Sequence, residues 1–354
     1  MDEARQRLSD PEWGLTFKLL LDLDGFMKWY LHGEDDFPRF PVFRCIVSGI
    51  TFRLAIGAGA SANHHGRGYA IAIDAGTGLQ VYNAVVSLLS HPDTLRSHRT
   101  VPGRPLAGRL ALQLLTSEGA ILKFGPQRGQ AIPPNDPKLL NGFKAICTFA
   151  HYFLFLHELA HVIGGHVERG AELVRESHSL RPSQRQEFME THRFPLEFLA
   201  DAYSVSLATN LVNTLVAGVR TPSDRSARSD VLDHLVYWGF AVAVVFLLFE
   251  TLSVTGAEKT YPTASERAFY SRYFALAKSD GVPLGFSHVP TAEGFAAISR
   301  GYEEALTAWD ALGWERKNIV PTDSQAMAGR VNAEMSKCAR PPCILPERQS
   351  SEIE

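Results

Sequence analysis

The sequence predicts an α+β fold that is mainly helical, with a small sheet in its N-terminal part. Three observations lead to this prediction. Apolar residues recur at helical spacing through residues 137–164, from Pro195 onward, and through residues 231–254. Residues 41–56 are rich in Val, Ile and Phe, as β-strands are. Tyr69–Asp74, with the sequence YAIAID, alternates in the way that strands do.

The elements before residue 136 follow from shorter patterns. Residues 15–31 and 78–91 carry apolar residues at the spacing of a helix, and the second pattern ends before a His-Pro pair. Residues 41–56 are expected to form one or two strands. Residues 57–68, GAGASANHHGRG, are expected to be a loop because Gly and Asn favour turns. We expect an N-terminal α/β region over residues 1–135.

Helices are expected to dominate after residue 136. The expected order is a long helix over 137–164, a polar mobile loop over Glu168–His192, a helix from Pro195 past Leu207, a charged loop over 219–230 and an apolar helix over 231–254. We expect residues 136–337 to form one helical region. The Pro-rich residues 338–354 are expected to be disordered.

The apolar helix contains an uninterrupted run, Leu235–Phe249, in which every residue is apolar or Gly. A membrane span needs about 20 such residues, whereas runs of about 10–14 are typical of buried helices. This run falls between the two lengths. We expect a core helix, and membrane contact through residues 235–249 stays open as the less favoured alternative.

Composition excludes several classes of protein. The chain has 35 Lys and Arg against 38 Asp and Glu, so its formal net charge is −3 and no overall basic field favours nucleic acid. Its four cysteines are too few for a disulfide scaffold. The polar N-terminus lacks the apolar core of a signal peptide. A cytoplasmic protein with free thiols is expected.

The long helix over 137–164 carries a motif that indicates chemistry. His157-Glu158-Leu159-Ala160-His161 is an H-E-x-x-H sequence, which places the two histidines on one helix face. Two neutral imidazoles on one face can bind the same Zn²⁺ ion. Glu158 is placed to accept a proton from a metal-activated water. A zinc site, with Glu158 as catalytic base, is therefore expected.

A zinc site needs a third protein ligand, and the sequence offers two candidate positions for it. A metzincin has a third histidine ten residues after the first, but Val167 occupies that position and His166 comes one residue early. The following helix offers Glu197 and Asp201, which share a face at i and i+4. One carboxylate can bind the metal while the other orients a ligand histidine.

H-E-x-x-H followed on a later helix by Glu197-Phe198-Leu199-Ala200-Asp201 resembles the gluzincin metallopeptidases. The resemblance implies a zincin-like core with His157, His161 and Glu197 as zinc ligands, Glu158 as base and Asp201 orienting a histidine. The H-E-L-A-H-x-x-x-G-H string is similar to the Lit-type phage-exclusion peptidases, which implies an intracellular endopeptidase acting on a protein substrate. The match covers about 50 residues, Phe153–Ala202.

Two further segments bear on the same activity. Tyr261-Pro262 with Arg267 resembles the H-P-x-x-x-x-R element of several gluzincins, which implies that Tyr261 and Arg267 stabilise the transition state. Tyr261 stands where the family has His, and Arg267 can instead pair with a carboxylate. Tyr203 and His192 are further candidates for the oxyanion. The strand Tyr69–Asp74 is either an internal strand or the exposed edge that binds substrate.

Two other functions remain open at this stage. A membrane-associated metalloprotease would use the apolar run over 235–249 for membrane contact. A zinc-bound module that recognises a partner without hydrolysing it would use the same ligands. We expect a protein substrate, no nucleic acid partner and Zn²⁺ as the cofactor.

Overall fold

The structure is a computed structural model that describes most of the chain between Val47 and Cys338. The described ranges are 47–53, 60–65, 68–99, 112–115, 121–124, 136–217, 225–253, 262–263, 265–270, 289, 291–314 and 324–338. The predicted helix over 15–31 lies outside them, and so does the predicted disordered tail over 338–354 except for its first residue, Cys338. Within the described part the fold is mainly helical with small sheets, as the sequence predicts.

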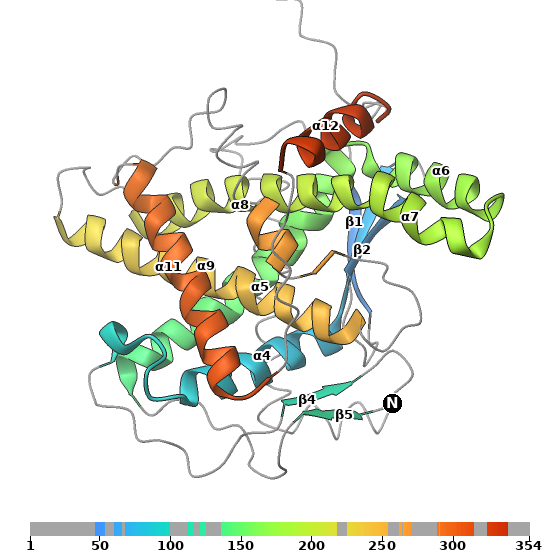
Figure 1. Ribbon diagram of the computed structural model, residues 1–354. Coiled ribbons are helices and arrows are strands. Elements are labelled where there is room, and N and C mark those ends of the chain that lie inside the picture. Colours follow the sequence, from blue (N-terminus) through green and yellow to red (C-terminus); the bar gives the residue numbers. More distant parts are fainter. Residues whose placement is uncertain are drawn as a thin grey trace, which may run out of the picture.

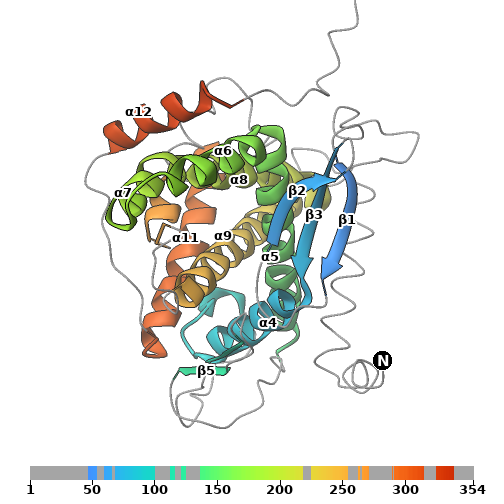
Figure 2. The same cartoon turned by 90° about the vertical axis from the view of Figure 1, so that its right-hand side faces the viewer.

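Three strands form the larger sheet in the order β1 (Val47–Arg53), β3 (Gly68–Asp74), β2 (Ala60–His65). β3 runs parallel to β1 and antiparallel to β2, so it is the internal strand. The sheet lies along one side of the central helix α5 (Pro137–Ile163), which contacts both β2 and β3 (Figure 2). The edge of the sheet beside this helix is therefore β2.

β2 corrects the expectation of a loop over residues 57–68. Its sequence, ASANHH, contains no β-branched residue and no apolar residue other than Ala, which is why the pattern does not indicate a strand. Pairing with the buried strand β3 places Ala62 opposite Ile71 and Asn63 opposite Ala70. The tertiary partner, rather than the local sequence, makes this segment a strand.

The helical body is built around α5 and α9 (Arg225–Ser253). These two helices pack against each other, α8 (Phe194–Ala217) contacts both, and α11 (Thr291–Ala311) lies along α9 (Figure 1). α4 (Ala75–Ser90) follows β3 directly and contacts α5 and the hairpin strand β4 (Leu112–Leu115), which pairs with β5 (Ile121–Phe124). α9 begins at Arg225, within the expected loop over 219–230. The apolar pattern does not indicate this start because the first two turns of the helix are mainly polar.

Two glycines allow α9 and α11 to approach closely. A Cβ atom on Gly239 would overlap the carbonyl oxygen of Ile298, and one on Gly301 would overlap that of Val236. Each helix therefore presents a glycine to the backbone of the other. The apolar run Leu235–Phe249 lies at this contact and is almost entirely buried.

In the part of the chain that the structure describes, two helices are long and apolar enough to cross a membrane by length and composition, α5 and residues Arg228–Thr251 of α9. Inside the protein, 67% and 83% of their apolar windows are buried. This burial is typical of core helices, whose apolar surface faces other protein segments.

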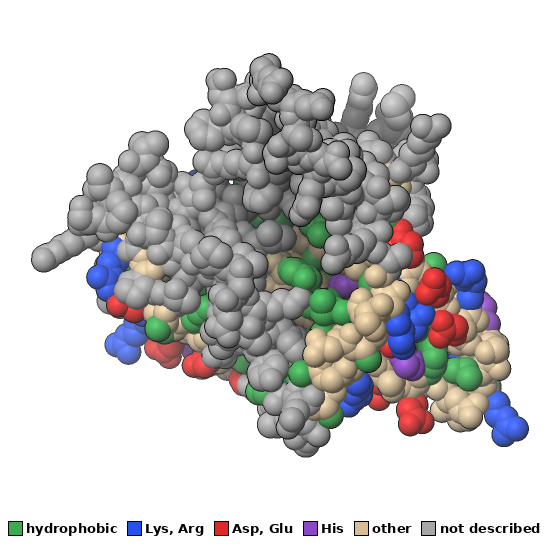
Figure 3. Space-filling view, turned by 90° about the horizontal axis from the view of Figure 1, so that it is seen from above, with side chains coloured by type: hydrophobic (Ala, Val, Ile, Leu, Met, Phe, Trp, Pro, Cys, Tyr) green, Lys and Arg blue, Asp and Glu red, His purple; other side chains and the backbone are tan. Residues whose placement is uncertain are grey.

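The segment Glu168–His192, expected to be a mobile loop, forms two helices instead. α6 (His166–His178) and α7 (Pro182–His192) make a hairpin at one end of the molecule, where acidic and basic side chains intermingle on the surface (Figure 3). The buried stripe of α6 is His166, Arg169, Leu173 and Ser177, and no residue of α7 is buried. With a single apolar residue in that stripe, the hydrophobic pattern does not indicate a helix.

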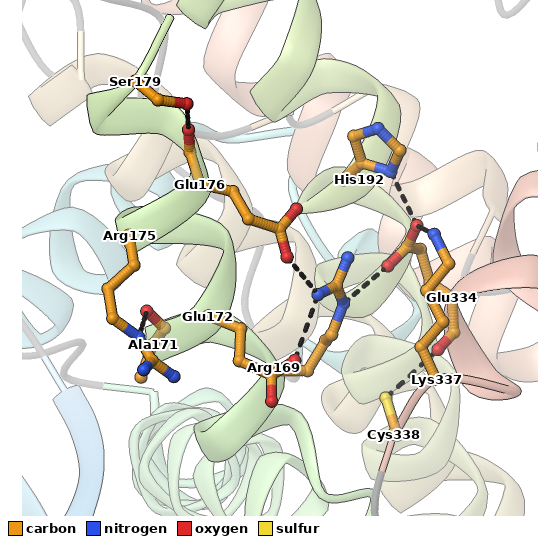
Figure 4. A network of polar contacts seen from close by, with 10 residues as sticks. All are labelled: Arg169, Ala171, Glu172, Arg175, Glu176, Ser179, His192, Glu334, Lys337 and Cys338. Carbon is orange, nitrogen blue, oxygen red and sulfur yellow. Dashed lines mark hydrogen bonds and ion pairs between the residues drawn. The ribbon is translucent and has the colours of Figure 1, made fainter.

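The C-terminal helix α12 (Ser324–Met335) is attached to this hairpin through charges (Figure 4). We call Arg169, Glu172, Glu176, His192, Glu334 and Lys337 the Arg169 cluster. Arg169 Nε donates to Glu334 Oε2 over 3.0 Å, and Arg169 Nη1 donates to Glu172 and Glu176. Glu334 Oε1 lies 2.6 Å from His192 Nδ1 and 2.7 Å from Lys337 Nζ. On its other side, α12 packs Met327 and Val331 against Phe198 of α8.

Candidate metal centre

The motif histidines lie in the last turns of α5. Asp136 caps the start of the helix by accepting hydrogen bonds from the backbone N–H groups of Lys138 and Leu139, and Pro137 occupies the first turn. The helix ends at Gly164, as the sequence predicts. His157, Glu158 and His161 therefore occupy a helix that is buried along most of its length.

α8 brings the two predicted carboxylates to the same place. It begins at Phe194 and packs against α5, with Glu197 in its first turn. Glu197 and Asp201 lie one turn apart on the face toward α5, while Phe198 and Ala202 pack into the apolar cluster beneath α12. The side chains of Glu197 and Asp201 are 6% and 0% exposed, so both carboxylates are removed from water.

Three ligand atoms converge between the two helices. His157 Nε2 lies 3.0 Å from His161 Nε2, and Glu197 Oε2 lies 3.4 Å and 3.6 Å from these nitrogens. Ligand atoms at about 2.0–2.1 Å from a tetrahedral zinc ion are separated from one another by about 3.3–3.4 Å. The three observed separations bracket that value. Among the described residues these three form the group that can hold a metal ion.

The polar atoms of this group also fit a cation. Glu197 Oε2 is buried and accepts no hydrogen bond within the described part of the chain, so its charge needs a cation nearby, either a protonated ring or a metal ion. Burial favours the neutral acid, but the His161 and His157 imidazoles hold the pKa of Glu197 well below its usual range. The carboxylate is therefore ionised and aimed at two ring nitrogens.

Asp201 supports His157 from behind. Its Oδ1 lies 2.9 Å from His157 Nδ1, on the side of the ring opposite the ligand nitrogen. Arg267 donates two hydrogen bonds to Asp201, of 2.8 Å from Nε and 2.7 Å from Nη2. Burial favours the neutral acid, yet Arg267 outweighs it and lowers the pKa of Asp201. A carboxylate ionised in this way fixes the orientation of the ligand ring.

Burial also acts on His157, where it favours the neutral ring. The carboxylates of Asp201 and Glu197 outweigh that effect and raise the pKa of His157 to about 9. Binding a metal through Nε2 therefore displaces a proton from this site.

Glu158 lies beside the ligands and faces the sheet. It is 7% exposed, and burial raises the pKa of its carboxyl, while the backbone N–H of Ala62, which hydrogen-bonds to it, acts in the opposite direction. A carboxyl with a raised pKa is suited to exchanging protons near neutral pH. The contact with Ala62 places the edge strand β2 directly at the metal centre, a feature that the sequence pattern did not indicate.

The other predicted site residues that the structure describes, Arg267, His192 and Tyr203, do not belong to the group of three ligand atoms. Arg267 is buried, with its guanidinium bonded to Asp201 and lying 4.6 Å from the ring centroid of Phe246 in α9. His192 belongs to the Arg169 cluster, and Tyr203 packs beside the apolar cluster beneath α12. Tyr261 lies outside the described residues. The catalytic roles predicted for Tyr261 and Arg267 stay predictions.

No protein-family model, curated protein or solved structure matches the chain. The assignment of a function therefore depends on the residues and geometry described above.

Proposed function

We propose that this protein is a zinc-dependent peptidase of the gluzincin type that hydrolyses a peptide bond in a protein substrate. The single observation that carries the proposal is the convergence of His157, His161 and Glu197 beside the buried carboxyl of Glu158. Three protein ligands with a carboxylate at hand are typical of catalytic rather than structural zinc sites, which have four.

The ligands have distinct tasks in this proposal. His157 and His161 offer neutral nitrogens from one helix, and Glu197 offers the anionic oxygen from another. When bound there, zinc supplies Lewis acidity, which activates water and polarises a carbonyl group. Asp201, held by Arg267, keeps the His157 ring in the orientation that binds.

Glu158 acts as the proton carrier. Its carboxylate accepts a proton from the attacking water and then donates it to the leaving amine. Burial serves this task because it raises the pKa of Glu158 from its usual value. A glutamate in contact with bulk water would hold that proton less readily at neutral pH.

The edge strand β2 supports a peptide as the substrate. Within the described residues β2 pairs with β3 on one side, and its other side faces no strand. An extended peptide can add to such an edge through backbone hydrogen bonds. Because Ala62 of β2 contacts Glu158, a peptide on this edge passes the proton carrier.

The test is elemental mass spectrometry of purified protein combined with a cleavage assay on a peptide library. We expect about one zinc per chain in the wild type and in Glu158→Gln, and loss of zinc in Glu197→Ala. Of these three proteins, only the wild type should cleave the peptides. Glu176→Gln, in the Arg169 cluster, is the matched control and should keep both zinc and activity.

Two outcomes would contradict the proposal in different ways. Wild-type protein prepared without chelators that carries no metal would exclude the zinc centre. Protein that carries zinc but cleaves no peptide would favour the alternative of a zinc-bound recognition module.

A further inference from the structure

His166 contacts the metal centre without belonging to the three proposed ligands. Its Nδ1 lies 3.1 Å from Nδ1 of His161, whose opposite nitrogen, Nε2, lies 3.0 Å from His157 Nε2. The two rings meet edge to face, with centroids 5.2 Å apart. One nitrogen of His161 thus faces the ligand group and the other faces His166.

The turn between α5 and α6 accounts for this position. Gly164 ends α5, and Gly165 has a φ of 69°. This is a left-handed backbone conformation that residues other than Gly adopt only with strain. The chain reverses there, and α6 begins at His166 itself. The reversal places the imidazole back over the last turn of α5, where it is 3% exposed.

Gly164 is required for a second reason. A Cβ atom at this position would lie 2.5 Å from His166 Nε2 and 2.8 Å from its Cδ2, which is closer than real side chains pack. The His166 ring therefore occupies the space that a side chain at residue 164 would fill. The Gly-Gly pair fixes both the direction of the turn and the place of the ring.

The tautomers follow from the chemistry of imidazole. An N···N hydrogen bond between two neutral rings needs one N–H and one lone pair. If His161 Nε2 offers its lone pair to a metal, His161 carries its proton on Nδ1 and donates it to Nδ1 of His166. His166 then carries its own proton on Nε2.

We propose that His166 is a positioning residue for metal binding, which accepts the Nδ1–H of His161 and holds that ring with Nε2 toward the ion. The inference rests on the proposed zinc centre. It gives the two ligand histidines different supports, since His157 is backed by the Asp201–Arg267 ion pair and His161 by a neutral ring. Supports of this kind contribute about 10–100-fold to metal affinity.

The experiment measures zinc affinity by competition with a chromophoric chelator. His166→Phe keeps an aromatic ring but removes the acceptor, and we expect a loss of about 10–100-fold in affinity. His166→Asn restores an acceptor oxygen and should recover part of the loss. Gly164→Ala, which displaces the ring, should also weaken binding. His178→Phe, at the exposed end of α6, should match the wild type.

A spectroscopic readout separates positioning from a merely structural role. In zinc-loaded protein labelled with ¹⁵N at histidine, the spectrum should show the proton of His161 on Nδ1 and that of His166 on Nε2. Thermal unfolding followed by circular dichroism shows whether each variant is folded.

The inference and the proposed function fail in different ways. Folded His166→Phe that binds zinc as tightly as the wild type, or a His161 ring without a proton on Nδ1, would overturn the role of His166 and leave the zinc centre standing. Wild-type protein that binds no zinc would instead overturn the centre itself.

Discussion

Two polar clusters among the described residues, the Arg169 cluster and the candidate metal centre, have buried members of similar types but differ in how their charges are arranged. In the Arg169 cluster the central carboxylate, Glu334, contacts Arg169, Lys337 and the imidazole of His192, and Arg169 reaches three carboxylates (Figure 4). In the metal centre the acceptor Glu197 Oε2 and two ring nitrogens point at one place, and this oxygen accepts no hydrogen bond from the described residues.

The difference separates an ion-pair network from a site. A network in which acid and base are matched holds helices together and needs nothing further. A buried carboxylate oxygen that faces two ring nitrogens is unfavourable when all three are deprotonated, and it is stabilised when a proton or a metal cation lies among them. The Arg169 cluster joins α6, α7 and α12, whereas the candidate metal centre is a group of side chains that could hold a metal ion.

The sharpest way to test this comparison is to make the same change in both clusters. Glu158→Gln removes the proton carrier of the metal centre, and Glu172→Gln removes a half-exposed carboxylate of the Arg169 cluster. We expect hydrolysis to fall by about 10²–10⁴-fold in the first variant and to be unchanged in the second. Steady-state cleavage with zinc content measured in parallel checks this, and retained cleavage in Glu158→Gln would remove Glu158 as the base.

The two buried arginines give the next prediction. Arg267→Met leaves Asp201 buried without its cation, so the free energy of unfolding should fall by about 3–5 kcal/mol, and zinc affinity should fall with it. Arg169→Met should also destabilise the fold, because Glu334 loses a partner, but should leave zinc affinity unchanged in the folded fraction. Urea denaturation and chelator competition check the pair of variants. If Arg267→Met bound zinc as tightly as Arg169→Met, the proposal that Asp201, held by Arg267, orients His157 for metal binding would be contradicted.

Adding zinc should stabilise the metal centre selectively. A ligand that binds only the folded state at 100 times its dissociation constant raises the free energy of unfolding by about 2.7 kcal/mol. We therefore expect zinc to raise the melting temperature of the wild type and of Glu334→Gln, and to leave that of Glu197→Gln unchanged. Differential scanning calorimetry with and without zinc measures it. A shift retained in Glu197→Gln would indicate a different third ligand.

The convergence of His157, His161 and Glu197 could be predicted from the sequence because most of the spacing is local. His157 with His161, and Glu197 with Asp201, are pairs one helical turn apart, and such pairs share a face wherever the helix lies. The contact between Arg267 and Asp201 agrees with one of the two partners foreseen for Arg267. The helix ends at Pro137 and Gly164 also follow from local capping signals.

The remaining features depend on partners far away in the sequence. Arg169 meets Glu334 across most of the C-terminal half of the chain, and no local pattern links them. α6 and α7 are held by such charges rather than by an apolar stripe, so their sequence resembles a loop. β2 is a strand because β3 pairs with it, and its contact through Ala62 with Glu158 could not be predicted from either segment alone.

The smallest expected effect is a loss of stability in acid that comes from Glu334 in the Arg169 cluster. Although burial favours the neutral acid, hydrogen bonds from Lys337, His192 and Arg169 lower the pKa of Glu334 in the folded state. A lowered folded pKa contributes stability that is complete above the unfolded value of about 4.3 and is lost as the pH falls through the folded value.

The effect of acid on Glu334 is measured as a difference between variants, because Asp201 and Glu197 also have lowered pKa values and their contributions to stability also fall in acid. Glu334→Gln should be less stable than the wild type at pH 7, and the two should converge as the pH falls below about 4. Glu303→Gln, on the exposed side of α11, should follow the wild type throughout. Urea denaturation at several pH values measures this difference. A difference in the free energy of unfolding that stays constant with pH would mean that Glu334 stabilises the fold through packing and not through its charge.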